Sequence, residues 1–251
     1  MDVKGVTGRS VVITGAGGGI GAATAALFEE AGATVARWDL AAPTVPVGGF
    51  ALAVDVTDRQ SVEQAFAATT DAIGTVSVLV HTAGVLRAGS ALTEDNNDWD
   101  ACMAVNATGT MNVAREAARR FVAAGAGVIT AVGSNAASTP RTNMAAYGAS
   151  KAAATAYMRS LGLEIAPQGI RCNIISPGST DTPMLRGMWD GTDQSAGVIA
   201  GDADAYRLGI PLGRLAQPGD IAATALFLSS DAARHITMHD LRVDGGATLD
   251  M

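Results

Sequence analysis

Short runs of apolar, mostly β-branched residues alternate with longer alanine-rich stretches from one end of the chain to the other. Strands that are buried on both faces form continuous apolar runs of this kind, whereas the alanine-rich stretches have the length of helices. The alternation therefore predicts a parallel sheet with helices on both of its faces. The expected strands are residues 10–14, 33–37, 50–54, 77–80, 127–132, 170–175 and 240–243, and the expected helices are residues 19–31, 58–72, 99–124, 147–166 and 218–229.

The chain of 251 residues is long enough for one large, well-buried core, and we expect residues 1–251 to form a single domain. The expected fold class is α/β, with a Rossmann-type, doubly wound sheet of seven parallel strands. Residues 177–211 are the one long segment without a helical or strand period. A loop of that length inside a compact domain is usually a lid or a binding loop.

Composition narrows the range of partners and locations. The net charge is −7, which argues against nucleic acid and anionic membranes as partners. Two uncharged stretches, residues 11–28 and 121–140, have the length of a membrane span, but glycine clusters or polar residues interrupt both, so we expect buried strands and loops in a soluble protein. The two cysteines, Cys102 and Cys172, are too few for a disulfide framework, and no signal-peptide pattern is visible, which favours a reducing, cytoplasmic location.

A glycine-rich turn, Thr14-Gly-Ala-Gly-Gly-Gly-Ile-Gly21, follows the first expected strand and opens the first expected helix. Glycines there allow a tight turn and let the backbone approach a pyrophosphate, which then lies at the positive end of the helix. Asp39 ends the second strand, where a carboxylate accepts hydrogen bonds from the adenosine ribose and repels the 2′-phosphate of NADP, so the sequence predicts NAD. Asp55, after the third strand, is expected either to contact adenine or to cap the helix that begins near residue 58.

Tyr147 and Lys151 are four residues apart on an expected helix and therefore lie on one face of it. The chain has only 3 Tyr, so the spacing is unlikely to arise by chance. We expect the ammonium of Lys151 to lower the pKa of the phenol and make it a base. Ser134, at the end of the fifth strand, is expected to hold the reacting oxygen beside Tyr147.

These features together resemble the short-chain dehydrogenase/reductase family over essentially the whole chain. The resemblance implies NAD binding in the first half, with catalysis and a substrate loop in the second, and it implies a homotetramer. Asn106 matches the helix asparagine with which the family holds a water in its proton relay, and Pro177-Gly178 with Thr180 and Thr182 match the segment that orients the nicotinamide. The expected catalytic residues are Asn106, Ser134, Tyr147 and Lys151, and the expected cofactor contacts are Gly15, Gly19, Ile20, Gly21, Asp39, Asp55, Val56, Ala83, Gly84, Tyr147, Lys151, Pro177, Gly178, Thr180 and Thr182.

One motif departs from the family pattern. The usual Asn-Asn-Ala-Gly after the fourth strand is His81-Thr-Ala-Gly84 here. Ala83 and Gly84 still have the size to pass under the cofactor, but the contacts of the two asparagines are replaced.

A narrower resemblance is to the 2,3-dihydro-2,3-dihydroxybenzoate dehydrogenases within this family. It implies NAD-dependent oxidation of a C3 alcohol, after which the dienone tautomerises to 2,3-dihydroxybenzoate, the catechol acid of siderophores. The segments that carry it are residues 85–89, 139–151, 176–182, 208–213, 235–239 and 243–249.

Two arginines support an anionic substrate independently of the resemblance. Arg141 lies in the loop between Ser134 and Tyr147, and Arg87 follows the fourth strand. Both therefore belong to the carboxyl edge of the sheet, where ligands bind in open α/β folds. Because a guanidinium fits a carboxylate bidentately, we expect Arg87 and Arg141, with Ser134 and Tyr147, to contact a dihydroaromatic carboxylate.

Three other functions remain open at this point. The substrate of a related dehydrogenase would be 2,3-dihydro-3-hydroxyanthranilate, in which an amino group replaces the C2 hydroxyl. A 3-oxoacyl carrier-protein reductase would use NADPH and a basic docking face, against which Asp39 and the acidic charge argue. A non-catalytic NAD-binding scaffold would not need the four catalytic residues. We expect no metal site, because His235 and His239 precede a strand, where a spacing of four does not place them together.

Overall fold

The computed structural model describes residues 3–45, 49–93 and 95–249. Seven parallel strands form one sheet in the order β3-β2-β1-β4-β5-β6-β7, which confirms the expected doubly wound topology. The order reverses between β1 and β4, and open α/β sheets bind ligands at the carboxyl edge beside such a reversal. The strands are β1 (Ser10–Thr14), β2 (Thr34–Asp39), β3 (Phe50–Ala53), β4 (Val76–His81), β5 (Gly127–Val132), β6 (Ile170–Pro177) and β7 (Asp240–Val243).

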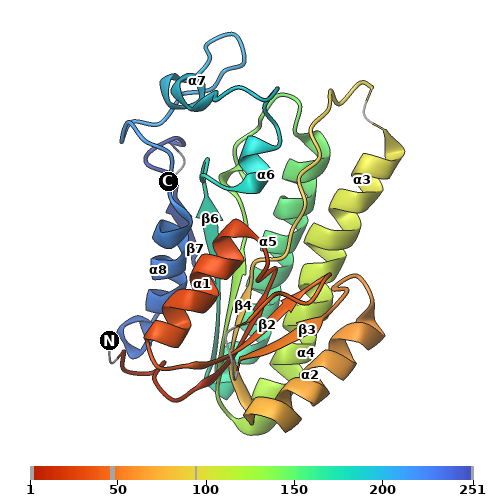
Figure 1. Cartoon of the computed structure of the whole chain (residues 1–251), viewed down its shortest axis with the longest axis vertical. Helices are drawn as coiled ribbons and strands as arrows, with labels where there is room; N and C mark the ends of the chain where they lie inside the picture. The colour runs from red at the N-terminus through yellow and green to blue at the C-terminus, as the bar shows by residue number, and fades with distance from the viewer. Residues whose placement is uncertain (1–2, 46–48, 94, 250–251) are drawn as a thin grey trace.

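Helices cover both faces of the sheet (Figure 1). On one face α1 (Gly19–Glu30) packs with α8 (Pro218–Ser229), and on the other lie α2 (Arg59–Ile73), α4 (Thr110–Ala124) and α5 (Ala145–Ile165). Alternate strand residues enter two separate cores: Val12 lies in the core under α4 and α5, whereas Ile13 lies in the core under α1 and α8. In the described part of the chain, no helix has both the length and the apolar character needed to cross a membrane.

The expected helix over residues 99–124 is three elements in the structure. An α-helix, α3 (Asn96–Cys102), runs into a π-helical turn at Met103–Gly109, and α4 follows. The turn is held by contacts distant in sequence, because Asn106 at its centre bonds to Val85 and Ser150, and Gly109 packs closely on Val56. Such turns occur often at functional sites, and an apolar period does not encode them.

The non-periodic segment 177–211 stands beyond the carboxyl edge of the sheet and carries two short helices, α6 (Pro183–Arg186) and α7 (Ser195–Ala200) (Figure 1). Its first part is fixed to the chain before α8, because Asp181 N donates to Ala216 O and Ala216 N donates to Ser179 O. The segment therefore has the position expected of a lid or binding loop.

Candidate active site

Most of the residues singled out by the sequence line two adjoining cavities at the carboxyl edge of the sheet. The first, here called the glycine-turn cavity, is lined by the turn after β1 and by the ends of β2 and β3. The second, the tyrosine cavity, is lined by Ser134, Tyr147, Lys151 and the segment after β6. Both share lining residues, so they form one continuous site; the shared residues are Ile20, Thr82, Gly84, Thr182 and Met184.

Glycine is required in the turn by close backbone packing. Gly15 has φ +67°, and a Cβ there would lie 2.7 Å from the backbone nitrogen of Ala83. Gly21 packs onto the carbonyl of Gly15, where a side chain would clash. The turn ends at Gly18, which has no side chain to cap α1, so the first N–H groups of the helix face the cavity region as donors for an anion.

Asp39 sets a negative charge at the far end of the glycine-turn cavity. Its Oδ2 accepts a hydrogen bond from Gly17 N at 2.9 Å, and its Oδ1 accepts one from Leu40 N at 2.7 Å. The nearby Arg37 forms two hydrogen bonds to Glu29 and is only 11% exposed, so its charge is already paired. The balance of charge at this end of the cavity is therefore negative.

The two roles expected for Asp55 can now be separated. The residue that caps α2 is Asp58, which accepts from Gln60 N at 2.8 Å, so capping by Asp55 is wrong. Asp55 lines the glycine-turn cavity, and its Oδ1 accepts from the backbone and hydroxyl of Thr57. Asn112 on α4 fixes this loop by donating to the carbonyls of residues 56 and 57, a role that no sequence motif predicted.

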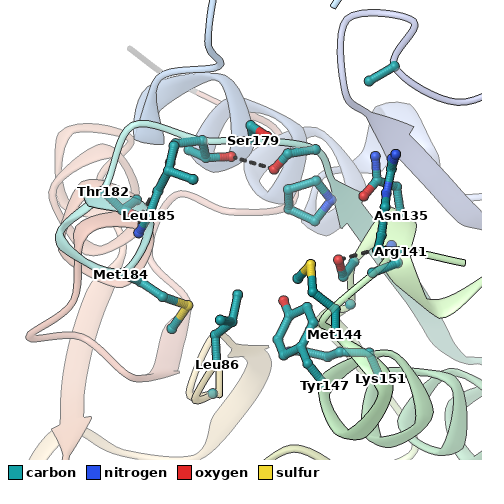
Figure 2. A pocket seen from close by; sticks show the side chains of 18 of the residues that line it. Leu86, Asn135, Arg141, Met144, Tyr147, Lys151, Ser179, Thr182, Met184 and Leu185 are labelled. Carbon is teal, nitrogen blue, oxygen red and sulfur yellow. Dashed lines mark hydrogen bonds between the residues drawn. The ribbon is translucent and has the colours of Figure 1, made fainter. Parts of the chain in front are cut away.

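Ser134, Tyr147 and Lys151 all line the tyrosine cavity, and Figure 2 shows Tyr147 and Lys151 on the same helix. Ser134 follows β5, and its Oγ accepts from Ala136 N at 3.1 Å, which holds the hydroxyl in place. Lys151 lies one turn after Tyr147 on α5, with its Nζ 6.0 Å from the centre of the tyrosine ring. The ammonium donates to Val132 O at 2.9 Å, which joins the catalytic helix to the end of β5.

Burial dominates the electrostatics of these groups. It raises the pKa of Tyr147, and a hydrogen bond with Ser134 offsets part of that rise. It also lowers the pKa of Lys151 to about 8. In the protein by itself the pKa of Tyr147 is therefore raised rather than lowered as expected, because burial disfavours the phenolate.

Asn106 is completely buried and does not line either cavity. Its Oδ1 accepts from Val85 N at 2.9 Å, and its Nδ2 donates to Val85 O and to Ser150 Oγ. The side chain thus fixes the chain after β4 against the catalytic helix. A part in holding a water of the proton relay stays a prediction.

His81 and Thr82, which replace the family's asparagines, fasten β4 to β1. His81 Nδ1 lies 2.8 Å from Thr14 Oγ1, and Thr82 Oγ1 donates to Thr14 O at 2.6 Å. His81 is buried, and its Nε2 has no hydrogen-bond partner in the described part of the chain. Burial, with the charge of Lys151, lowers the pKa of His81 to about 3, so the ring is neutral at ordinary pH.

Only one of the two expected arginines reaches the site. Arg141 lines the tyrosine cavity, where Figure 2 shows it beside Asn135 and across from Met184 and Leu185. Arg87 is not among the lining residues; its side chain is 50% exposed, and its Nε lies 3.4 Å from Asp98 Oδ1. The chain after β4 runs outward there, with Gly89 N bonded to Asn143 O.

Arg207 is a cavity residue that the sequence reasoning missed. It comes from the segment after α7. Burial lowers the pKa of Arg141, the positive charge of Arg207 lowers it further, and Asp244 raises it. The one sequence signal was its location in the non-periodic segment 177–211, which does not say which side chain turns inward.

The chain is similar to known dehydrogenases and reductases over nearly its whole length. Residues 15–248 match the family model described as enoyl-(acyl carrier protein) reductase. The chain is 42% identical to the 2,3-dihydro-2,3-dihydroxybenzoate dehydrogenase of Bacillus subtilis (strain 168) over 99% of each chain, and 44% identical to the enzyme of that name from Escherichia coli (strain K12), over 97% of this chain and 98% of the other. A solved 3-ketoacyl-(acyl-carrier-protein) reductase from Brucella melitensis, complexed with NADH, is similar with a TM-score of 0.85 and 31% identity, covering 97% of this chain and 100% of that one.

The buried, neutral His81 predicts a specific loss of stability in acid. The ring takes up a proton near pH 6.5 when unfolded but only near pH 3 when folded, so the unfolded state binds more protons between these values and stability falls as pH falls below about 6.5. Between pH 7.5 and 5.0 this group should remove about 2 kcal/mol from the free energy of unfolding. Urea unfolding of the wild type and of His81→Asn at both pH values measures this loss, because the contributions of all other titrating groups are common to the two proteins and cancel in the difference. An equal loss in the two proteins would contradict the assignment.

Proposed function

The chain belongs to the short-chain dehydrogenase/reductase family, and from that premise we propose that it oxidises the C3 alcohol of 2,3-dihydro-2,3-dihydroxybenzoate with NAD⁺. The product is 2,3-dihydroxybenzoate, which serves catechol siderophore biosynthesis. The observation that carries the proposal is that Arg141 shares one cavity with Ser134 and Tyr147. A cation for a carboxylate and the groups that handle an alcohol thus face the same small space.

The residues around the glycine-turn cavity fit a nicotinamide dinucleotide. The uncapped start of α1 supplies donors for the pyrophosphate, and Asp39 supplies acceptors for the ribose. Thr180 and Thr182 line the adjoining tyrosine cavity and would contact the nicotinamide end. When bound, the oxidised nicotinamide supplies a hydride acceptor and a positive charge.

Tyr147 is the group that takes the alcohol proton. Its hydroxyl bonds with Ser134, so a substrate oxygen placed between the two hydroxyls is held in position for proton transfer. Lys151 brings a buried ammonium to the same helix face, and this charge, added to that of the cofactor, favours the phenolate. As the C–H and O–H bonds at C3 break, the ring gains a ketone, and tautomerisation of the dienone to the catechol makes the step strongly downhill.

Arg141 is the residue assigned to the substrate carboxylate. It is half-buried on the wall of the cavity, and no hydrogen bond or ion pair joins its side chain to another described residue. A half-buried guanidinium without a protein partner favours an anionic ligand. Leu86, Met144, Met184 and Leu185 give the rest of the wall an apolar character that suits a six-membered ring.

We further propose a homotetramer in which α4 and α5 supply contacts. Val122 on α4 and Leu163 on α5 are 42% and 66% exposed, which supports apolar association there.

The function is tested by adding NAD⁺ and 2,3-dihydro-2,3-dihydroxybenzoate to the enzyme and recording reduced cofactor and catechol absorbance together. Equal amounts of the two products are expected. Parallel reactions with 2,3-dihydro-3-hydroxyanthranilate and with a 3-oxoacyl carrier-protein substrate and NADPH test the alternatives. Faster turnover of either alternative substrate would reject the proposal.

NAD should be preferred over NADP by at least about tenfold in kcat/KM, equivalent to about 1.4 kcal/mol, because the Asp39 carboxylate repels a 2′-phosphate. Steady-state kinetics with both cofactors measure the preference. In Asp39→Asn the preference should shrink, mainly through better use of NADP. Equal use of both cofactors by the wild type would show that Asp39 does not select.

Tyr147→Phe should lower kcat by about a hundredfold or more, because it removes the proton acceptor and keeps the ring. Binding of NADH, followed by its fluorescence, should persist. Lys151→Ala should instead weaken both cofactor binding and turnover. Near-normal turnover in Tyr147→Phe would mean that another group is the base.

Arg141→Ala should cost about 2–4 kcal/mol in kcat/KM on the carboxylated dihydrodiol, because it leaves the carboxylate unpaired. The loss should appear mainly in KM, since the carboxylate is bound in the ground and transition states alike. The uncharged carboxamide analogue should lose little. Arg87→Ala is the matched control and should leave both substrates within about twofold, because the structure does not bring Arg87 to the cavity. Equal losses on both substrates in Arg141→Ala would make Arg141 structural.

A further inference from the structure

A second guanidinium stands at the tyrosine cavity without an acidic partner. Arg207 is exposed at the mouth of the cavity, whereas Arg141 is half-buried on its wall. Across the described residues, neither side chain has a hydrogen bond or an ion pair. By contrast, most other arginines of the chain pair with a carboxylate, among them Arg37, Arg59, Arg120, Arg186 and Arg214.

The acid whose charge acts on Arg141 is committed elsewhere. Asp244 is buried, and its two carboxylate oxygens accept hydrogen bonds from Asn135 Nδ2 at 3.2 Å, Gly246 N at 3.0 Å and Thr248 Oγ1 at 2.6 Å. Its charge favours the charged form of Arg141, but among the described residues this single carboxylate forms no ion pair with Arg141 or Arg207. Two like charges near one cavity repel each other, and an anion between them removes that repulsion.

The backbone that presents Arg207 is built rather than loose. Asp202 and Arg207 pair through two backbone hydrogen bonds of 2.9 and 2.8 Å, and Asp202 Oδ1 accepts from the next turn at Asp204 N and Ala205 N. Gly201 and Gly209 flank the pair with φ of +85° and +83°, in close contact with neighbouring backbone. This small hairpin, residues 202–207, holds its shape without help from the Arg207 side chain.

Tyr206 gives the hairpin a strained turn directly before Arg207. It has φ +55°, a left-handed conformation that a non-glycine residue rarely adopts, and its side chain is 92% exposed. Burial of the tyrosine ring does not offset the free-energy cost of this conformation, because the ring is exposed. Its effect is on the next residue, since Arg207 is directed to the cavity while Tyr206 is directed to solvent.

We propose that Arg207 is a specificity-determining residue, which completes with Arg141 a two-arginine site for the substrate carboxylate at the mouth of the tyrosine cavity. For the identity of the carboxylate this rests on the proposed function. Arg141 fixes the anion from the wall, and Arg207 covers it from the segment after α7. A neutral cyclic alcohol leaves the guanidinium charges of Arg141 and Arg207 unpaired, so it binds less tightly than a carboxylated substrate.

The first test compares Arg207→Met with Arg207→Lys on the carboxylated dihydrodiol and on its uncharged carboxamide. Arg207→Met should raise KM for the carboxylate about tenfold with little change in kcat, and Arg207→Lys should stay within about threefold, because it keeps the charge. KM for the carboxamide should change less than twofold in both. Rising salt should raise the wild-type KM for the carboxylate more steeply than that of Arg207→Met, since the contact is exposed to screening. Arg186→Met, which removes a surface arginine paired with Asp181 outside the cavity, is the control and should leave KM unchanged.

A second test uses binding alone, so that it does not depend on turnover. Titration of the NADH complex with 2,3-dihydroxybenzoate and with catechol should show tighter binding of the carboxylate, and Arg207→Met should remove most of that difference. If the dihydrodiol is not oxidised but this difference is present and depends on Arg207, the proposed function fails and the anion site stands. If the dihydrodiol is oxidised and Arg207→Met leaves carboxylate binding and KM unchanged, or changes both ligands equally, the role of Arg207 is overturned.

Discussion

The geometry of the site depends on one buried cation. Lys151 is 5% exposed, and an ammonium in such surroundings needs a partner, which it finds in the carbonyl of Val132 at the end of β5. This bond fixes α5 against the strand that leads to Ser134, and so sets Tyr147 opposite that serine. Gly84 is part of the same constraint: a Cβ there would lie 3.2 Å from Lys151 Nζ and 3.1 Å from Asn106 Oδ1, so the chain after β4 passes as close to the ammonium as a glycine allows.

Charge is divided along the continuous site in a way that matches its two proposed ligands. Asp39 makes one end negative, and the pairing of Arg37 with Glu29 leaves that charge without a local cation. Arg141 and Arg207 make the other end positive, and Asp244 is held by Asn135 and the chain that follows β7. Between the two ends lies a largely buried region that holds the serine, the tyrosine and the Lys151 ammonium, whose pKa is lowered to about 8. A dinucleotide and a small carboxylate are thus directed to opposite ends, with their reacting atoms in the middle.

The replaced motif after β4 shows how one structural task can be met by different side chains. His81 and Thr82 bind the end of β4 to Thr14 at the end of β1, which is where the strand order reverses. One ring nitrogen of His81 has a hydrogen-bond partner, and the other has none among the described residues. The buried ring therefore resists protonation. Asn106 secures the other side of the same loop through Val85. The path of the chain after β4 is therefore held from two sides.

The sequence by itself determined what local period and local chemistry encode. The bounds of β1, β5 and β7, the glycine turn, Asp39, and the set Ser134, Tyr147 and Lys151 all follow from residues close together in the chain, because strand burial, tight turns and a spacing of four on a helix are local properties. Only the tertiary structure decided the π-helical turn, the capping of α2 by Asp58, the direction of the Tyr147 pKa, and the exchange of Arg87 for Arg207. Each of these depends on how deeply a group is buried or on which distant segment it meets, and neither quantity is written in the order of the residues.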